Sequence, residues 1–183
     1  MKPTPSPLYD PRQEHDACGV GFIARLDAVP SHAVIDDALA ALGRMAHRGG
    51  GGGGPETADG AGILLPIPQT LMRRVWRSLC GEPPALYGIG QFFLPQNLAL
   101  RQQVEGVVER VLDEHNLHVR AWRDTPVRLD VLQKEAFRSK PVIRQAFVVR
   151  KNDFAQAGSD QDFERSLYVA RRHVEQAVAA ETG

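Results

Sequence analysis

Cys18 is the residue whose type and place in the chain are best suited to covalent chemistry. It follows a proline-rich polar stretch, residues 1–17, and begins a short apolar run, CGVGFIARL. A cysteine attacks as a thiolate, so a nearby group has to take its proton. If the Ala17–Cys18 bond were cut, the new α-amino group, with a reference pKa of about 7.7–8.0, would lie on the same residue and could be that base. The alternative is that Cys18 is a small buried apolar residue, as free cysteines usually are.

The elements around Cys18 can be predicted from the hydrophobic pattern. Residues 1–17 lack a periodicity that could bury one face, so we expect a leader outside the core. Residues 18–26 are predicted as a strand. Ser31 is a candidate N-cap for an amphipathic helix that ends at six consecutive glycines, Gly49–Gly54. Because glycine loses the most backbone entropy on ordering, the glycine run predicts a loop.

The rest of the chain alternates strands with helices. Strands are predicted over four ranges: 62–67, 87–94, 118–122 and 142–150. The helical spacing of apolar residues predicts one helix over about 71–79, a second capped by Asn97, and a third from Asp160 almost to the end. From this pattern alone the fold class is α/β or α+β.

Composition excludes several classes of protein. Lys plus Arg and Asp plus Glu both number 22, so the formal net charge is zero and no nucleic acid or anionic membrane is indicated as a partner. The polar first 17 residues do not resemble a signal peptide, and no stretch is apolar for long enough to span a bilayer. The two cysteines, Cys18 and Cys80, lack the paired spacing of a metal site. We therefore expect a soluble, cytoplasmic protein.

Three segments in order resemble one known family. They are CGVGFIA at 18–24, HRGG at 47–50 and TADGAGILLPIP at 57–68. This arrangement is similar to the opening of the glutaminase domain of the glutamate synthase large subunit, a class II glutamine amidotransferase. There a leader, a cysteine before Gly-Val-Gly, a helix ending in His-Arg-Gly and a Thr-Gly-Asp-Gly turn have the same spacing. Three later segments also resemble the family, YGIGQFFLP, RQAFVVRK and DFERSLYVARRHVE, so the resemblance covers essentially the whole chain.

The resemblance implies a fold, a processing step and a reaction. The fold would be α+β, the four-layer αββα sandwich of the N-terminal nucleophile hydrolases, incomplete at its C-terminal side. Residues 1–17 would be a pro-sequence, and residues 18–183 the N-terminal part of the glutaminase domain. Family members hydrolyse glutamine to glutamate and ammonia through a cysteinyl thioester, which here would form on Cys18.

Four further residues match motifs of the family. Arg48 and Gly49 fall on the His-Arg-Gly motif at the glutaminase site, where a guanidinium would suit a carboxylate or an active-site loop. Without the match, Arg48 would be interpreted as a helix-end arginine beside terminal carbonyls. Asp59 and Gly60 would shape the turn before the following strand, a structural and not a catalytic role.

Some positions depart from the family pattern. Gly54 stands where an aspartate is usual, and Glu56 and Ala58 stand where lysine and glycine are common. Ala58 would be costly if that position needs a positive φ. The oxyanion hole of the family is an asparagine-glycine pair, and no asparagine in this chain precedes a glycine. Because losing one oxyanion donor costs about a hundredfold to a thousandfold in rate, we expect the isolated chain to have negligible glutaminase activity.

Cofactors and partners are implied only for the complete family enzyme. There the ammonia passes to a synthase domain that uses FMN and an iron–sulfur cluster, so the remaining glutamate synthase domains or subunits are expected partners. This chain is expected to bind neither cofactor and no metal, since it lacks a cysteine cluster and a glycine-rich phosphate motif after a strand. Two alternatives stay open: a non-catalytic assembly or regulatory module that keeps the fold, and a related amidotransferase of sugar-phosphate or purine chemistry.

Overall fold

The structure is a computed structural model that describes residues 19–45, 61–130, 132, 134–151 and 159–182. The chain divides into two compact units, Met1–Pro66 and Ile67–Gly183, and each is described by itself. The predicted leader and the predicted glycine loop lie outside the described residues.

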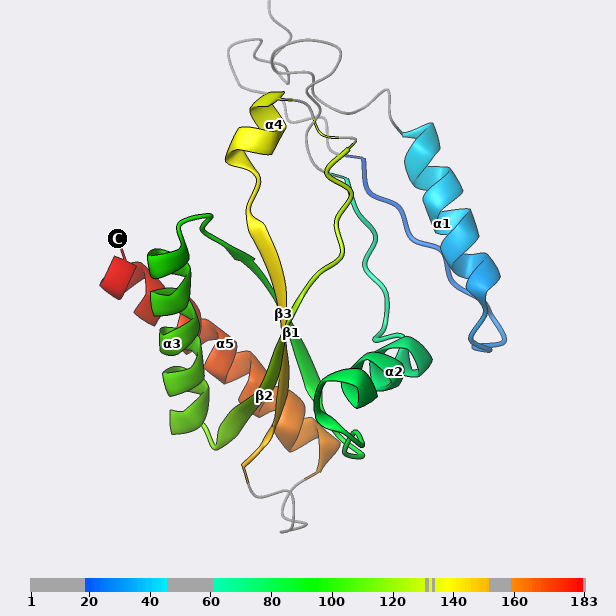
Figure 1. Ribbon diagram of the computed structural model, residues 1–183. Coiled ribbons are helices and arrows are strands. Elements are labelled where there is room, and N and C mark those ends of the chain that lie inside the picture. The colour runs from blue at the N-terminus through cyan, green and yellow to red at the C-terminus, as the bar shows by residue number, and fades with distance from the viewer. Residues whose placement is uncertain (1–18, 46–60, 131, 133, 152–158, 183) are drawn as a thin grey trace, which may run out of the picture. The chain divides into compact units, whose positions relative to one another are not determined.

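The first unit has one helix among its described residues, α1 (His32–Arg44; Figure 1). Ser31 has extended backbone, and its side-chain oxygen accepts a hydrogen bond from the Ala33 amide at 3.3 Å, which confirms the predicted N-cap. The helix was predicted to be amphipathic, yet no residue of α1 is buried and Leu39 is 50% exposed. Within the described residues the start of α1 is therefore fixed by its cap.

Two predicted strands are wrong. Residues 19–26 and 62–67 form no strand in the structure. Their apolar side chains are open to solvent, with Val20 93%, Phe22 94% and Leu64 102% exposed. A strand is stable only where a neighbour takes up its backbone N–H and C=O groups, and no described residue pairs with either segment. An apolar run in the sequence does not show whether such a neighbour exists.

The second unit is built on a three-stranded antiparallel sheet with the strand order β1–β3–β2. The strands are β1 (Gly88–Leu94), β2 (Leu117–Asp124) and β3 (Val142–Arg150). All three were predicted from the sequence and are confirmed. The central strand, β3, comes last in the chain, so β1 and β2 are not neighbours although they are consecutive.

Four helices accompany the sheet: α2 (Gln69–Cys80), α3 (Leu98–Glu114), α4 (Lys134–Ser139) and α5 (Asp160–Thr182). Figure 1 shows α3 and α5 on one face of the sheet and α2 on the other. Asn97 caps α3 as predicted, because its side-chain oxygen accepts a hydrogen bond from the Leu100 amide at 3.0 Å. The short α4 was not predicted, since its 6 residues are too few to show a helical repeat.

Alternation along β3 divides the core into two clusters. Ala146 and Val148 point to α3 and α5, whereas Phe147 and Val149 point to α2. The larger cluster joins the sheet to α3 and α5 through twelve buried residues: Leu94, Val104, Val107, Val108, Val111, Leu112, Leu117, Ala146, Val148, Phe163, Ala170 and Val174. The smaller cluster consists of Met72, Trp76, Tyr87, Phe147 and Val149.

The α+β class is confirmed. The strands form an antiparallel sheet, and the helices pack on it without the parallel βαβ crossovers of an α/β fold. The described residues contribute one such sheet to the αββα arrangement that the family implies.

Candidate functional site

The five residues predicted for the functional site lie outside the described residues. They are Cys18, Arg48, Gly49, Asp59 and Gly60. The structure therefore does not test whether they come together, and their roles stay predictions. The described residues that flank them, Gly19–Val29 and 61–66, are exposed and have no helix or strand.

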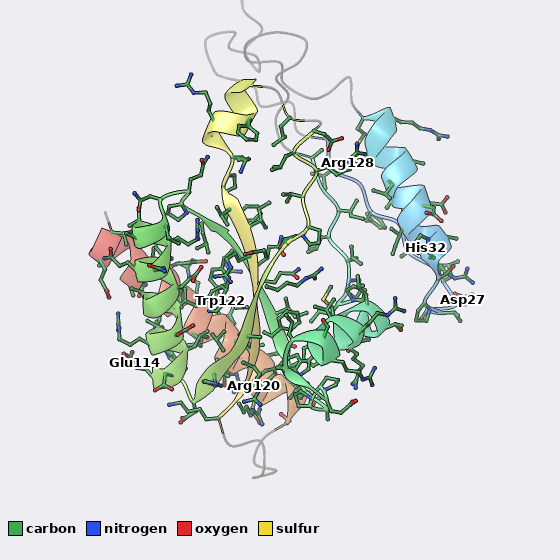
Figure 2. The ribbon with its side chains drawn as sticks, in the orientation of Figure 1. Asp27, His32, Glu114, Arg120, Trp122 and Arg128 are labelled. Carbon is green, nitrogen blue, oxygen red and sulfur yellow. The ribbon has the colours of Figure 1, made fainter. Side chains whose placement is uncertain are left out.

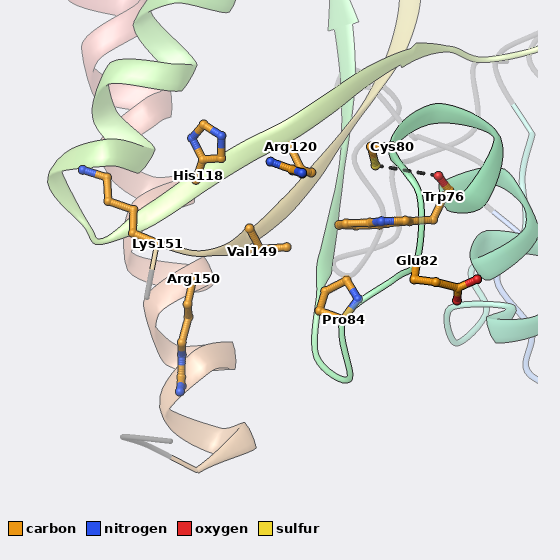
Figure 3. Close-up of a pocket in the computed structure, with 9 residues that line it drawn as sticks. All are labelled: Trp76, Cys80, Glu82, Pro84, His118, Arg120, Val149, Arg150 and Lys151. Carbon is orange, nitrogen blue, oxygen red and sulfur yellow. Dashed lines mark hydrogen bonds between the residues drawn. The ribbon is translucent and has the colours of Figure 1, made fainter. Parts of the chain in front are cut away.

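The second unit has a hollow of about 380 Å³ (Figure 3). It lies between the C-terminal end of α2 and the paired ends of β2 and β3. Its lining is Trp76, Cys80, Glu82, Pro84, His118, Arg120, Val149, Arg150 and Lys151. Sequence reasoning did not find this hollow, because its residues come from three separate stretches without a shared motif.

A β-bulge shapes one wall of this hollow. On β2, Val119 lies opposite Val148 and Ala121 lies opposite Phe147, so Arg120 between them has no partner on β3. The side chain of Arg120 lines the hollow. Beyond the bulge the alternation restarts, and Trp122 turns to the other face of the sheet, beside α3 (Figure 2).

The thiol of Cys80 lies in this hollow, yet its surroundings keep it protonated. Burial raises the pKa of the Cys80 thiol above its ordinary value, and the nearby charge of Arg120 lowers that pKa by less. The thiol lies 3.7 Å from the Trp76 carbonyl oxygen, to which it donates a hydrogen bond. Because the thiolate is the reactive form, Cys80 is a poor nucleophile near neutral pH.

Three charged groups that line the hollow are bonded to residues outside its lining. Three contacts account for them: Lys151 Nζ to Asp113 at 2.5 Å, Arg77 Nε to Glu82 at 3.1 Å, and Arg150 Nη2 to the Ser159 carbonyl at 3.1 Å. Because the Cys80 thiol that lines the hollow is kept protonated, we assign the hollow no part in catalysis.

The described residues contain neither a metal-ligand cluster nor a membrane-spanning helix. Among these residues no three His, Cys, Asp or Glu side chains gather as a cluster that could hold a metal ion. No helix within the described ranges is both long and apolar enough to cross a bilayer.

Comparison with known families identifies the chain. The family described as glutamine amidotransferases class-II matches residues 18–183. The chain belongs to the class II glutamine amidotransferases. The family predicted from the motifs around Cys18, Arg48 and Asp59 is thereby confirmed.

The amidotransferase chain is also similar to glutamate synthases. It is 40% identical over 185 residues to ferredoxin-dependent glutamate synthase 1, chloroplastic/mitochondrial, of Arabidopsis thaliana, covering 100% of this chain and 11% of that protein. It is 34% identical over 168 residues to the glutamate synthase [NADPH] large chain of Bacillus subtilis (strain 168), covering 92% of this chain and 11% of that one. The glutamate synthase [NADPH] large chain of Azospirillum brasilense is 33% identical over 180 residues, which cover 97% of this chain and 12% of that protein. The amidotransferase chain thus spans about a tenth of the length of these relatives.

Proposed function

We propose that this class II amidotransferase chain is the glutaminase portion of a glutamate synthase, with Cys18 as its nucleophile. The observation that carries the proposal is the family match, which begins at residue 18 and continues to residue 183. The chemistry of the second cysteine supports the choice, because the protonated Cys80 thiol is unsuited to attack. The relatives that are named glutamate synthases support the reaction class.

The proposed reaction begins with cleavage of the Ala17–Cys18 bond. The freed α-amino group then takes the thiol proton, and the sulfur attacks the side-chain amide carbon of glutamine. The C–N bond of the amide breaks, and its nitrogen takes up the proton and departs as ammonia. The acyl group remains on Cys18 as a thioester. Water attacks the thioester, which releases glutamate and restores the thiol. A thiol that has to stay reduced fits a reducing compartment such as the cytoplasm.

Arg48 and Gly49 are proposed to lie beside the substrate. A guanidinium presents a rigid fork of donors that matches a carboxylate, so Arg48 is suited to the glutamine carboxylate or to a loop that closes over it. Asp59 and Gly60 are proposed to shape the turn that follows. The departures at Gly54, Glu56 and Ala58 change the loop between these two pairs.

The remaining glutamate synthase domains or subunits are proposed as partners that complete the site. The oxyanion hole of the resembled family is an Asn-Gly pair, and each asparagine here, Asn97, Asn116 and Asn152, precedes another residue type. An iron–sulfur cluster takes about four cysteines and this chain has 2, and no glycine-rich phosphate motif follows a predicted strand, so neither the cluster nor FMN is proposed to bind here. No step is therefore derived through either cofactor.

Intact mass and active-site labelling test the nucleophile. The protein is incubated with an electrophilic glutamine analogue, and the adduct is located by peptide mass spectrometry. We expect a mature chain that begins at Cys18 and carries one adduct there. Cys18→Ala should abolish labelling, whereas Cys80→Ala should leave it unchanged. An adduct that persists in Cys18→Ala, or that is lost in Cys80→Ala, would contradict the assignment.

Ammonia release tests the need for partner domains. We expect the processed chain alone to release ammonia from glutamine at a rate close to the background without enzyme. Addition of the remaining glutamate synthase polypeptide should raise that rate, and Cys18→Ala should remain inactive in the mixture. Full turnover by the isolated chain would show that these 183 residues contain a complete site.

A further inference from the structure

Two histidines meet across the contact between α3 and α5. His115 Nε2 lies 2.7 Å from His173 Nδ1, and the two ring centroids are 4.7 Å apart with the rings inclined by 51°. This separation is that of a hydrogen bond, in which one ring donates its N–H to the bare nitrogen of the other. Two nitrogen lone pairs are thus available within one small volume once the shared proton moves.

The backbone positions both histidines. His115 is the C-cap of α3, and its amide donates to the Leu112 carbonyl at 3.0 Å. The next residue, Asn116, has a φ of 57° and accepts a hydrogen bond from the Lys151 amide at 3.0 Å. His173 lies on α5 directly before Val174, which is buried in the larger core cluster. Because rigid elements carry both imidazoles, a ligand would not have to order them first.

The neighbouring carboxylates are already committed to cations. Three ion pairs account for them: Asp113 with Lys151 at 2.5 Å, Glu114 with Arg110 at 3.1 Å, and Glu175 with Arg171 at 3.0 Å. The His115–His173 pair therefore offers imidazole nitrogens, and not carboxylate oxygens, as ligands. Within the described ranges no third His, Cys, Asp or Glu completes a larger cluster.

We propose that His115 and His173 form a binding site for a transition-metal ion, which would clamp the end of α3 to the middle of α5. Imidazole nitrogen is the donor preferred by Zn²⁺, Ni²⁺ and Cu²⁺, whereas Mg²⁺ prefers oxygen. Water would fill the remaining positions on the ion. The inference is independent of the glutaminase proposal, because neither histidine belongs to the predicted Cys18 site.

Little has to change for the ion to bind. Two nitrogens on adjacent positions of one ion, each at about 2.0–2.1 Å, lie about 3 Å apart, so the rings have to separate slightly and turn until both lone pairs point at the ion. The donor ring moves its proton to its other nitrogen, so no net proton is lost and both contacting nitrogens become bare. Both side chains are accessible to solvent, so the ion can reach them directly.

Thermal unfolding of the 183-residue chain without a polyhistidine tag tests the site. ZnCl₂ and NiCl₂ should each raise Tm, because an ion that binds only the folded state stabilises it, and MgCl₂ should not. The rise should be lost in His115→Gln and in His173→Gln. It should persist in His32→Gln and His118→Gln, which remove other described histidines.

A second readout uses the unaltered chain and does not depend on the folding of any variant. Diethyl pyrocarbonate modifies accessible imidazoles, and Zn²⁺ should protect His115 and His173 from it while His32 and His118 stay reactive. The proposal is overturned if the wild-type Tm does not respond to Zn²⁺ and Ni²⁺, if the response survives in both single variants, or if the two rings are modified equally with and without Zn²⁺.

Discussion

The indole of Trp76 meets the phenyl ring of Phe147 edge-on, with ring centroids 5.5 Å apart and ring planes at 86°. Trp76 belongs to α2 and is 2% exposed, and Phe147 belongs to β3 and is 0% exposed. Edge-to-face pairs add about 0.5–1.5 kcal/mol to the burial of the rings themselves. This contact is the centre of the smaller core cluster and fixes α2 against the sheet.

Removing one ring of this pair should strongly lower the stability of the second unit. Phe147→Ala should lower the free energy of unfolding by about 3–5 kcal/mol, since it leaves a cavity beside Trp76 that the neighbours cannot fill. Urea unfolding followed by tryptophan fluorescence measures the loss. Phe93→Ala on β1 is the control, because Phe93 is 67% exposed and its removal should change stability by about 0.5 kcal/mol or less. Equal losses in the two variants would contradict this description of the core.

Arg144 of β3 allows two ion pairs to be compared on one cation. It contacts Glu105 at 2.6 Å and Asp124 at 2.8 Å, but the Glu105 side chain is 15% exposed and that of Asp124 is 81% exposed. Glu105→Gln should cost about 1–3 kcal/mol of unfolding free energy, whereas Asp124→Asn should cost less than about 1 kcal/mol. Chemical denaturation at low and high salt measures both. A larger loss in Asp124→Asn would show that exposure does not decide the strength of these pairs.

Substitution by alanine should change stability in opposite directions at two glycines. A Cβ on Gly88 of β1 would lie 2.7 Å from Leu167 Cδ1 of α5, whereas a Cβ on Gly106 of α3 would meet nothing within 4 Å. Gly88→Ala should therefore lower stability by about 1–3 kcal/mol, because Leu167 has to leave its rotamer. Gly106→Ala should raise stability by about 0.5–1 kcal/mol, the gain expected for alanine in a helix. If Leu167 is the cause, the Gly88→Ala loss should shrink in a Leu167→Ala background, which a double-mutant cycle measures.

The start of α5 should give a pH-dependent contribution to stability. Asp162 accepts hydrogen bonds from the backbone amide and the hydroxyl of Ser159, each at 2.9 Å. The hydrogen bond from the amide is the main reason that the pKa of Asp162 lies below its ordinary 3.8. Because the pKa of Asp162 is lower in the folded state, the carboxylate stabilises the fold fully at pH values above its unfolded-state pKa. This stabilisation is lost as the pH falls through the folded-state pKa. The stability difference between wild type and Asp162→Asn should stay constant from about pH 7 to 5 and shrink below about pH 4. In a Ser159→Ala background the pH-dependent part should be smaller.

Elements with a clear repeat and a cap could be predicted from the sequence. The spacing of Val104, Val107, Val108 and Val111 indicated the buried face of α3, and Asn97 marked its start. The helix predicted from Asp160 is α5, and Phe163, Ala170 and Val174 are its buried residues. Helices are recognisable in this way because both their hydrogen bonds and their periodicity are local.

Features that depend on distant partners could not be predicted. Residues 19–26 have the apolar character of a strand, but strand pairing is non-local, and no described neighbour pairs with them. The bulge at Arg120 has no glycine to mark it, and it reverses the face on which Trp122 lies. The approach of His115 to His173 joins residues 58 positions apart. For the candidate catalytic site, the motifs predicted the residues and the family, and the family is confirmed.

The bulge on β2 also has a consequence for solubility. Among the strands of the described residues β2 lies at one edge of the sheet, where unpaired N–H and C=O groups could template the strand of another molecule. Arg120 interrupts the regular spacing of those groups, and its charge, together with that of Arg123 on the same strand, would have to lose water if a foreign strand docked there. This edge is therefore built to resist the growth of intermolecular β-structure at high protein concentration.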